Sequence, residues 1–316
     1  YKNVFKSIKV QLICYICFLT TVPLLFVCIV EYYSSKSAIE QRVIEQLTSI
    51  ADLKKSELNS WLEERLTDTS VIVRNKVLAA AAPSILQQRR RCESVYQLMN
   101  SETARINYNR VLENLHALKQ FYKHYNVISI IDGANGEVVI STYPDIVGKT
   151  LSSFNSYIDI LEKKDVAVKD IYTSELTGQN CMTYSCPVLM TDTVTLESSD
   201  VIIGIIVLDV NVKNSIEPLI RSWPGMGKTG ETLLVRREGD NIVYLNDLRH
   251  RQGAALKFTS PIRSTLDIPS VLSSRGEEGI KESKDNRGVN VLSAYRHISV
   301  PNWGLVAKQD LTEAFA

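Results

Sequence analysis

The segment Val127–Ile140 reads V-I-S-I-I-D-G-A-N-G-E-V-V-I and consists of two apolar runs around a turn-rich linker. The linker Asp132–Gly136 supplies the Asp, Asn and Gly residues that tight turns favour, so the segment predicts a β-hairpin. The chain before the hairpin has helical periodicity, whereas the chain after it is extended. A sheet therefore starts here, behind a helical N-terminal region, and the sequence predicts an α+β fold.

Two helical segments precede this hairpin. Between Ser37 and about Ala82 the chain is nearly free of Gly and Pro, and apolar residues recur at three- and four-residue intervals. This pattern predicts one long amphipathic helix, which Pro83 ends or bends. A second helix is predicted from Tyr96 to about Tyr122.

The elements after the hairpin fall into two series with the same order. The first series has a short helix at Phe154–Leu161 and strands near Val166–Thr173, Cys181–Leu189 and Val201–Val210, with an exposed loop at Thr191–Asp200. The second series has a hairpin at Thr232–Arg236 and Ile242–Leu245, a short helix near Ile268–Ser273, and strands near Glu278–Glu282, Val289–Arg296 and Trp303–Lys308. We therefore predict two consecutive antiparallel-sheet modules that stand on the long helix.

A membrane-spanning helix is predicted at the N-terminus. Val10–Val30 has no formal charge over 21 residues, which is long enough to cross the hydrocarbon layer of about 30 Å. Three lysines precede the span without an acid among them, and Glu31 follows it directly, so the N-terminus is expected in the cytoplasm and the remainder outside. A cleaved signal peptide is the alternative, but its apolar core is usually only about 7 to 15 residues long.

The chain therefore divides into three predicted regions: a cytoplasmic tail and span at 1–33, the long helix with a membrane-distal module at 34–222, and a membrane-proximal module at 223–316. The amino-acid composition of these regions indicates no particular binding partner. The 36 basic and 35 acidic residues form no block of like charge, which argues against a nucleic-acid surface. Three cysteines lie within the span, and the exported Cys92, Cys181 and Cys186 are expected to be buried and unpaired.

Several segments stand in a characteristic order after the span and the long helix: Gly133–Thr142, G-M-G-K-T-G-E-T-L-L-V at Gly225–Val235, Asp247–Leu256, Arg287–Arg296 and Asn302–Ala316. With these segments and the two modules, the chain resembles the double Cache sensor domains of prokaryotic signalling receptors. The resemblance covers about residues 8 to 316. The resemblance implies two PAS-like modules outside the cell, with a small molecule bound in the membrane-distal one.

No complete catalytic motif is found in the sequence. Met226–Thr229 reads M-G-K-T like the end of a P-loop, yet Ser222 stands where that motif needs its first glycine. The four histidines are scattered without metal-ligand spacing, and there is no G-x-S-x-G. We therefore expect no enzyme activity, no cofactor and no metal in this region.

The candidate pocket lies in the first module, where the resemblance places the ligand. Eight residues there could supply an apolar wall and polar groups: Tyr143, Phe154, Tyr157, Asp170, Tyr172, Thr173, Tyr184 and Asp209. Asp209 resembles the aspartate with which amino-acid-binding relatives hold the ligand amine. Their carboxylate-binding arginine has no counterpart, since no arginine occurs between Arg110 and Arg221. A small cationic or neutral polar molecule is therefore favoured, and the alternative is that these aromatic residues are simply core.

Three classes of function remain open: a ligand-sensing receptor domain, a structural or dimerising spacer, and an anchored exported enzyme. A homodimer is predicted through an apolar seam on the long helix at Ile39–Leu62. Asp310 and Glu313 have the spacing of a capping box, which predicts a helix that starts there and returns to the membrane beyond Ala316. A kinase, cyclase or chemotaxis module is expected on its cytoplasmic side.

Overall fold

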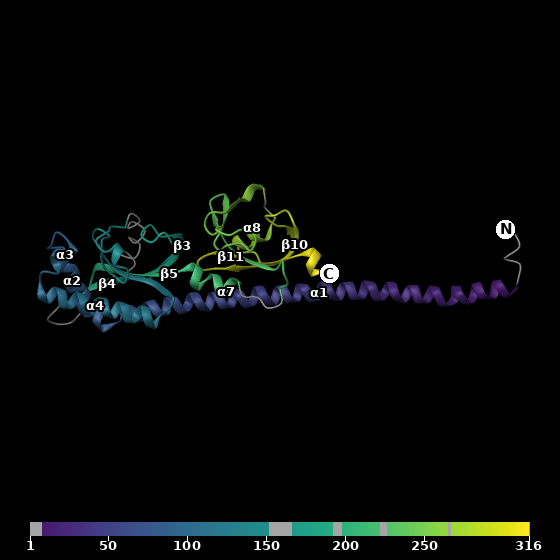
Figure 1. The fold of residues 1–316 in the computed structure, drawn as a ribbon, viewed down its shortest axis with the longest axis horizontal. Coiled ribbons are helices and arrows are strands. Elements are labelled where there is room, and N and C mark those ends of the chain that lie inside the picture. The colour runs from purple at the N-terminus through teal and green to yellow at the C-terminus, as the bar shows by residue number, and fades with distance from the viewer. Residues whose placement is uncertain (1–7, 152–165, 192–197, 222–225, 265–266, 316) are drawn as a thin grey trace.

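The computed structural model describes residues 8–151, 166–191, 198–221, 226–264 and 267–315. Its axis is the 66-residue helix α1, Ile8–Val73. A pair of antiparallel sheets is placed along the C-terminal portion of this helix, one sheet after the other (Figure 1). The N-terminal portion of α1 extends beyond both sheets and carries the exposed apolar residues of the predicted span, with Pro23 inside it. This arrangement confirms the α+β fold class.

The helical region ends differently from the prediction. The break lies at Arg74 and Asn75, and Asn75 caps the next helix α2, Lys76–Arg89, by accepting hydrogen bonds from the amides of Val77 and Leu78 at 2.9 and 3.3 Å. Pro83 lies inside α2 and is buried, so the prediction that it ends or bends the long helix is wrong. An N-cap that satisfies two backbone donors decides the boundary here.

The second predicted helix is also interrupted. It consists of α3, Val95–Leu98, and α4, Glu102–Phe121, and the side chain of Ser101 caps α4 by accepting from the Ala104 amide. Together with α2, these helices cover the end of the first module that lies farthest from the predicted span (Figure 1).

The first sheet has the strand order β2-β1-β5-β4-β3. Its strands are β1, Tyr125–Asp132; β2, Val138–Ser141; β3, Ala167–Thr173; β4, Asn180–Thr191; and β5, Ser198–Asn211. The predicted hairpin is present as β1 and β2, with Ser129 opposite Ser141, and the 3-10 turn η2, Pro144–Ile146, follows. The predicted loop at Thr191–Asp200 is shorter than expected, because Thr191 still pairs with Ser198. The predicted helix at Phe154–Leu161 lies outside the described residues.

The second sheet repeats this order as β8-β7-β6-β11-β10-β9. Its strands are β6, Glu231–Glu238; β7, Asn241–Tyr244; β8, Thr259–Pro261; β9, Gly279–Lys284; β10, Asn290–Ile298; and β11, Trp303–Asp310. The short helices α6, Val212–Ser215, and α7, Glu217–Arg221, connect the two sheets, while η4, Ile262–Ser264, and α8, Pro269–Ser274, belong to the second module, which ends in α9, Leu311–Ala314. The predicted recurrence of a hairpin followed by three strands is confirmed.

Helix α1 packs against both sheets through one face. Leu58 joins the core between the helices and the first sheet, and Leu47 joins the cluster under the second sheet with Ala307. Four residues of the predicted dimer seam are therefore buried within the chain: Leu47, Leu58, Trp61 and Leu62. Ile39 and Leu53 remain exposed, by 44% and 54%. An intermolecular contact along α1 would have to use this other face.

Two of the three cysteines predicted to be buried, Cys181 and Cys186, are buried. Cys181 and Cys186 are buried on opposite faces of β4, Cys92 is half-buried, and the six cysteines are free. Cys14, Cys17 and Cys28 are exposed on the N-terminal portion of α1.

Candidate functional site

The two faces of the first sheet have different roles. Leu208 and Val210 point into the core shared with the helices, so Asp209 between them points to the opposite, outer face. Its neighbours across the sheet are Val127 on β1 and Thr183 on β4, which must point the same way.

Asp209 is the centre of a polar group on this outer face. The hydroxyl of Thr183 donates a hydrogen bond to Asp209 Oδ1 at 2.6 Å, and Thr183 Oγ1 lies 3.0 Å from the hydroxyl of Tyr172. The ammonium of Lys169 lies 3.9 Å from the centre of the Tyr172 ring, at cation–π distance. Asp209, Thr183, Tyr172 and Lys169 are called the Asp209 group below.

The charges of the Asp209 group are tuned by burial. Burial raises the pKa of Asp209 to about 6, although the hydrogen bond from Thr183 and the charge of Lys169 act in the opposite direction. Burial likewise lowers the pKa of Lys169. At neutral pH the face therefore presents a half-buried carboxylate that is charged but poorly solvated, and a cation that replaces its lost hydration would stabilise it.

The structure brings some of the predicted site residues to this group and not others. Tyr172 and Asp209 are members. Thr173 is exposed beside Tyr172 and donates to the side chain of Asn180. Tyr143 follows β2, at the opposite edge of the sheet from β3, and is 39% exposed. Phe154 and Tyr157 lie outside the described residues.

Tyr184 and Asp170 lie elsewhere. Tyr184 is fully buried in the core on the helix side of the sheet, with its hydroxyl 3.8 Å from Met182 Sδ. Asp170 faces the second module, where one oxygen accepts from Trp303 Nε1 at 2.9 Å and the other pairs with Arg236 at 2.6 Å. The pairing of β3 with β4 shifts register between Lys169 and Tyr172. As a result, Lys169 and Tyr172 belong to the Asp209 group, whereas Asp170 between them contacts the second module.

Thr183 and Lys169 were missed from the sequence. Alternation along β4 shows only that Thr183 and Tyr184 point to opposite faces, and the choice between the faces depends on the register with β5. Lys169 precedes Asp170 in a strand whose periodicity is broken by the register shift. The available sequence signal for Thr183 was that it lies two residues after Cys181 and therefore points to the same face of β4. Lys169 had no comparable signal.

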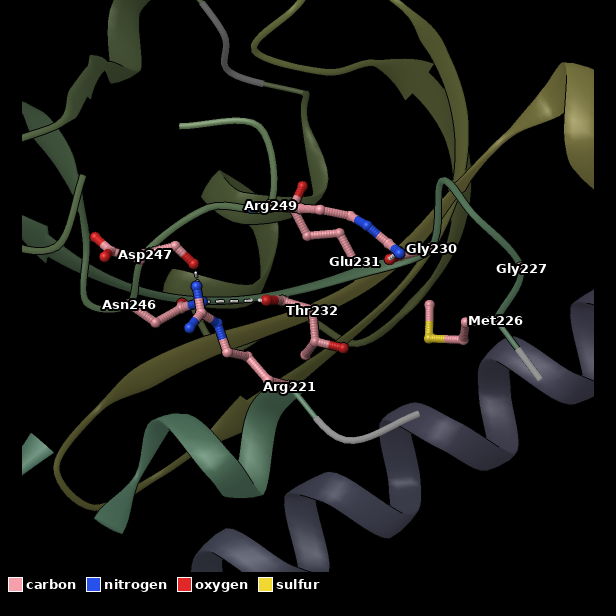
Figure 2. Close-up of a pocket in the computed structure, with 9 residues that line it drawn as sticks. All are labelled: Arg221, Met226, Gly227, Gly230, Glu231, Thr232, Asn246, Asp247 and Arg249. Atoms are coloured by element: carbon pink, nitrogen blue, oxygen red, sulfur yellow. Dashed lines mark hydrogen bonds between the residues drawn. The ribbon is translucent and has the colours of Figure 1, made fainter. Parts of the chain in front are cut away.

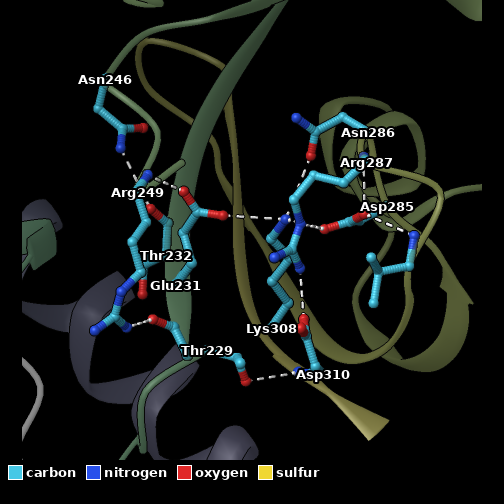
Figure 3. Close-up of polar contacts among 12 residues, drawn as sticks. Thr229, Glu231, Thr232, Asn246, Arg249, Asp285, Asn286, Arg287, Lys308 and Asp310 are labelled. Carbon is cyan, nitrogen blue, oxygen red and sulfur yellow. Dashed lines mark hydrogen bonds and ion pairs between the residues drawn. The ribbon is translucent and has the colours of Figure 1, made fainter. Parts of the chain in front are cut away.

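The second sheet has a lysine at the position of Asp209. Strands β5 and β11 occupy corresponding places in the two sheets, and Asp209 and Lys308 each stand two residues before the N-cap of the following helix, Asn211 and Asp310. Lys308 is 2% exposed, and its ammonium lies 2.7 Å from Asp285 Oδ2 and 3.1 Å from Glu231 Oε2 (Figure 3). This module therefore supplies its own cation at the corresponding position.

The predicted capping box at Asp310 and Glu313 does not form. The side chain of Asp310 makes no cap hydrogen bond; it pairs with Arg287 at 2.5 Å. Glu313 instead accepts hydrogen bonds from the amides of Lys228 and Thr229, at 2.6 and 2.7 Å, and from the Thr229 hydroxyl. The M-G-K-T turn thus binds a carboxylate of its own chain through backbone N–H groups, which are a more favourable partner than the N-cap amide alone.

The described residues contain no group of three His, Cys, Asp or Glu side chains arranged to hold a metal ion. They include one helix, α1, that is long and apolar enough to cross a membrane.

A match to a family model shows the family of this chain. A family model described as Cache domain, of the double Cache type, matches residues 35–316, and the chain belongs to this family of ligand-binding sensor domains. The expected resemblance is confirmed. A search of curated proteins found no match.

Solved structures with this fold include chemoreceptor domains from three bacteria. The sensory domain of Campylobacter jejuni Tlp3 with isoleucine bound has a TM-score of 0.54 and 13% identity, covering 89% of this chain and 98% of that one. The domain of Pseudomonas aeruginosa PctC in complex with GABA has a TM-score of 0.53 and 16% identity, covering 84% of this chain and 99% of that one. The domain of Pseudomonas fluorescens CtaA in complex with L-isoleucine has a TM-score of 0.52 and 17% identity, covering 90% of this chain and 98% of that one. At these identities the likeness shows the fold alone.

Proposed function

We propose that this chain is the ligand-sensing region of a transmembrane receptor, and that the Asp209 group binds the amine of a small molecule. The observation that carries the proposal is the half-buried carboxylate of Asp209, held by Thr183 with a pKa raised to about 6. An ammonium group would give this carboxylate a charge-assisted partner. The amino-acid and GABA complexes of structures with the same fold support a small amine as the ligand class.

The membrane setting belongs to the same proposal. The N-terminal portion of α1 crosses the membrane with its N-terminus in the cytoplasm, and the two sheets lie outside. Beyond the short helix α9, the chain leads to a second span and a cytoplasmic signalling module. Two copies associate along α1. The exposed apolar residues of the span and the candidate membrane helix support this arrangement.

Calorimetric titration of the purified chain with a panel of primary amines, with and without a free carboxylate, tests the site. Asp209→Asn keeps the shape of the side chain and removes its charge, so we expect at least a tenfold loss of affinity, equivalent to about 1.4 kcal/mol. The exposed Asp145 provides the matched control, and Asp145→Asn should leave affinity unchanged.

The competing functions predict other results. A structural spacer would bind none of the amines although the chain is folded. An amine that binds the wild type and Asp209→Asn equally well would place the ligand somewhere else. Ligands with a free carboxylate that bind more tightly than simple amines would point to a full amino acid and to Lys169 as its second partner.

A further inference from the structure

A cleft in the second module has no role in the function proposed above. It has a volume of about 300 Å³ and lies between the end of α7, the start of β6 and the segment after β7 (Figure 2). Its lining residues are Arg221, Met226, Gly227, Gly230, Glu231, Thr232, Asn246, Asp247 and Arg249. We propose that this cleft is a second binding site, and that it takes a small oxyanion, a carboxylate or a phosphate.

Thr232 is the first observation that points to a ligand. The residue is 5% exposed, and its hydroxyl is one of the few buried side-chain oxygens without a hydrogen-bond partner among the described atoms. Figure 2 shows its side chain between Arg221 and Met226, where it lines the cleft. Buried hydroxyl groups nearly always have a partner, and this one is closed to solvent beside a cleft, so a bound molecule becomes its partner once the Thr232 side chain turns towards the cleft.

The charges around the cleft select an anion. Its acidic residues are already satisfied within the chain: Glu231 by Lys308 and by the amide of Arg249, and Asp247 by the amide of Ala255. The two guanidinium groups are not saturated in this way. Arg249 donates to the carbonyl of Gly230, and Arg221 lies 3.4 Å from Glu217.

In Figure 2 the Arg221 side chain extends towards Asn246, and the Arg249 side chain extends towards Gly230, so the cleft has a guanidinium on each of two sides. A guanidinium has five N–H donors in a planar fork that fits carboxylates and phosphates, so either group can bind an oxyanion in the cleft. A cation would meet the positive charges of both arginines and is disfavoured.

The cleft shares a wall with the turn that holds Glu313. Met226, Gly227 and Gly230 line the cleft, while Lys228 and Thr229 between them bind the Glu313 carboxylate. An anion in the cleft would therefore touch the same turn that fixes the start of the C-terminal helix. Occupancy of this site would change how firmly that helix is held.

Titration of the purified chain with inorganic phosphate and with succinate, each against chloride at equal ionic strength, tests the site. Thr232→Val is the decisive variant, because it keeps the shape of the residue and removes the unpaired hydroxyl. We expect the variant to bind at least tenfold more weakly while its unliganded melting temperature stays the same or rises. Arg221→Gln and Arg249→Gln should also lose affinity, and the exposed Arg237 on the same strand serves as the control through Arg237→Gln.

The two probes distinguish a phosphate from a carboxylate ligand. No binding of either probe, or equal binding by wild type and Thr232→Val, overturns the proposal. So does an equal loss in Arg237→Gln, which would reveal a diffuse effect of surface charge. Asp209→Asn should bind the anion like the wild type, so failure of the amine site leaves this result readable.

Discussion

Asp170 in the first sheet accepts a hydrogen bond from the indole of Trp303 in the second sheet, with 2.9 Å between Nε1 and Oδ1. The donor ring is fully buried, and the second oxygen of Asp170 pairs with Arg236. Lys169 directly precedes Asp170 in β3, Tyr172 follows it by two residues, and both belong to the Asp209 group. One edge strand therefore carries some of the candidate ligand site on one side and the joint between the modules on the other.

The joint should be measurable as an interaction energy. Asp170→Asn keeps an acceptor for the indole but removes the charge that pairs with Arg236, and Arg236→Gln removes the other charge. We expect each single variant to lower the free energy of unfolding by about 1 to 3 kcal/mol, with a coupling above about 0.5 kcal/mol in a double-mutant cycle from urea unfolding. Additive losses would show that the two side chains do not depend on each other.

Lys308 should be essential for the second module. Lys308→Met removes the cation that Asp285 and Glu231 share and leaves Arg287 as the remaining partner of Asp285, so we expect a loss of about 3 to 5 kcal/mol in the free energy of unfolding. Lys284→Met, at an exposed position on β9, removes the same charge and should have little effect. A variant at Lys308 as stable as the control would mean that the ion pairs contribute nothing.

The effect of Lys308→Met should depend on pH. Burial raises the pKa of Asp285, but Lys308 and Arg287 lower it more, and the net pKa lies below the ordinary value of 3.8. The ion pairs therefore contribute their full stability above about pH 4 and lose it as the pH falls through the lowered pKa. The difference between wild type and variant should stay constant between pH 6 and about pH 4 and shrink as the pH falls further.

Asp209 should act in the opposite direction. Its folded-state pKa of about 6 lies above the ordinary value of 3.8, so the unliganded chain should lose stability as the pH rises from about 4 through 6. Asp209→Asn should abolish this fall and leave the chain more stable than the wild type at pH 7. Thermal unfolding of both proteins between pH 4 and 8 measures this pH dependence. Parallel curves of melting temperature against pH would contradict the prediction.

Glu313 should hold the turn at Lys228 and Thr229 over a wide pH range. The hydrogen bonds from Thr229 and from the two backbone amides lower the pKa of Glu313 to about 2, so the contact persists above that value and is lost only below it. Glu313→Gln weakens the acceptor, and we expect faster hydrogen exchange at these two amides. Glu282→Gln, at an exposed position on β9, is the control. Unchanged exchange in Glu313→Gln would show that the Glu313 carboxylate does not hold this turn.

The exposed face of α1 should form the contact between copies. Leu53 is 54% exposed, whereas Leu47 on the same helix is 1% exposed and packs within the chain. In membranes, Leu53→Cys should crosslink to a second copy under mild oxidation and Leu47→Cys should not. Crosslinking at neither position, or only at Leu47, would refute an α1 dimer with this face inward.

Much of the fold could be predicted because it depends on local periodicity. Both hairpins and the order of strands follow from runs of Val and Ile bounded by Gly, Asn and Asp, as at Asp132–Gly136. Helix boundaries were less accessible. Pro83 is tolerated inside α2 because buried neighbours stabilise the helix around it, whereas Asn75, a polar residue with no obvious role in sequence, decides the end.

The site was harder to predict for a physical reason. Asp209 and Tyr172 could be selected by their chemistry, but Tyr184 has the same chemistry and faces the core. Only the register between β4 and β5 decides between the faces, and a shift of one residue would exchange them. Asp170, Trp303 and Glu313 contact residues 65 or more positions away, and such pairings leave no trace in local sequence patterns.

The 66 residues of α1 form one uninterrupted rod that touches both sheets and continues into the candidate span. A helix of this length measures about 100 Å, and it bends sharply only where its hydrogen-bond ladder is broken. No described residue between the sheets and the candidate span breaks this ladder, so in the proposed membrane setting a tilt of α1 at the first sheet would be passed on to the span. Pro23 has no backbone N–H for the ladder, and in that setting the place where α1 bends most readily would lie inside the candidate span.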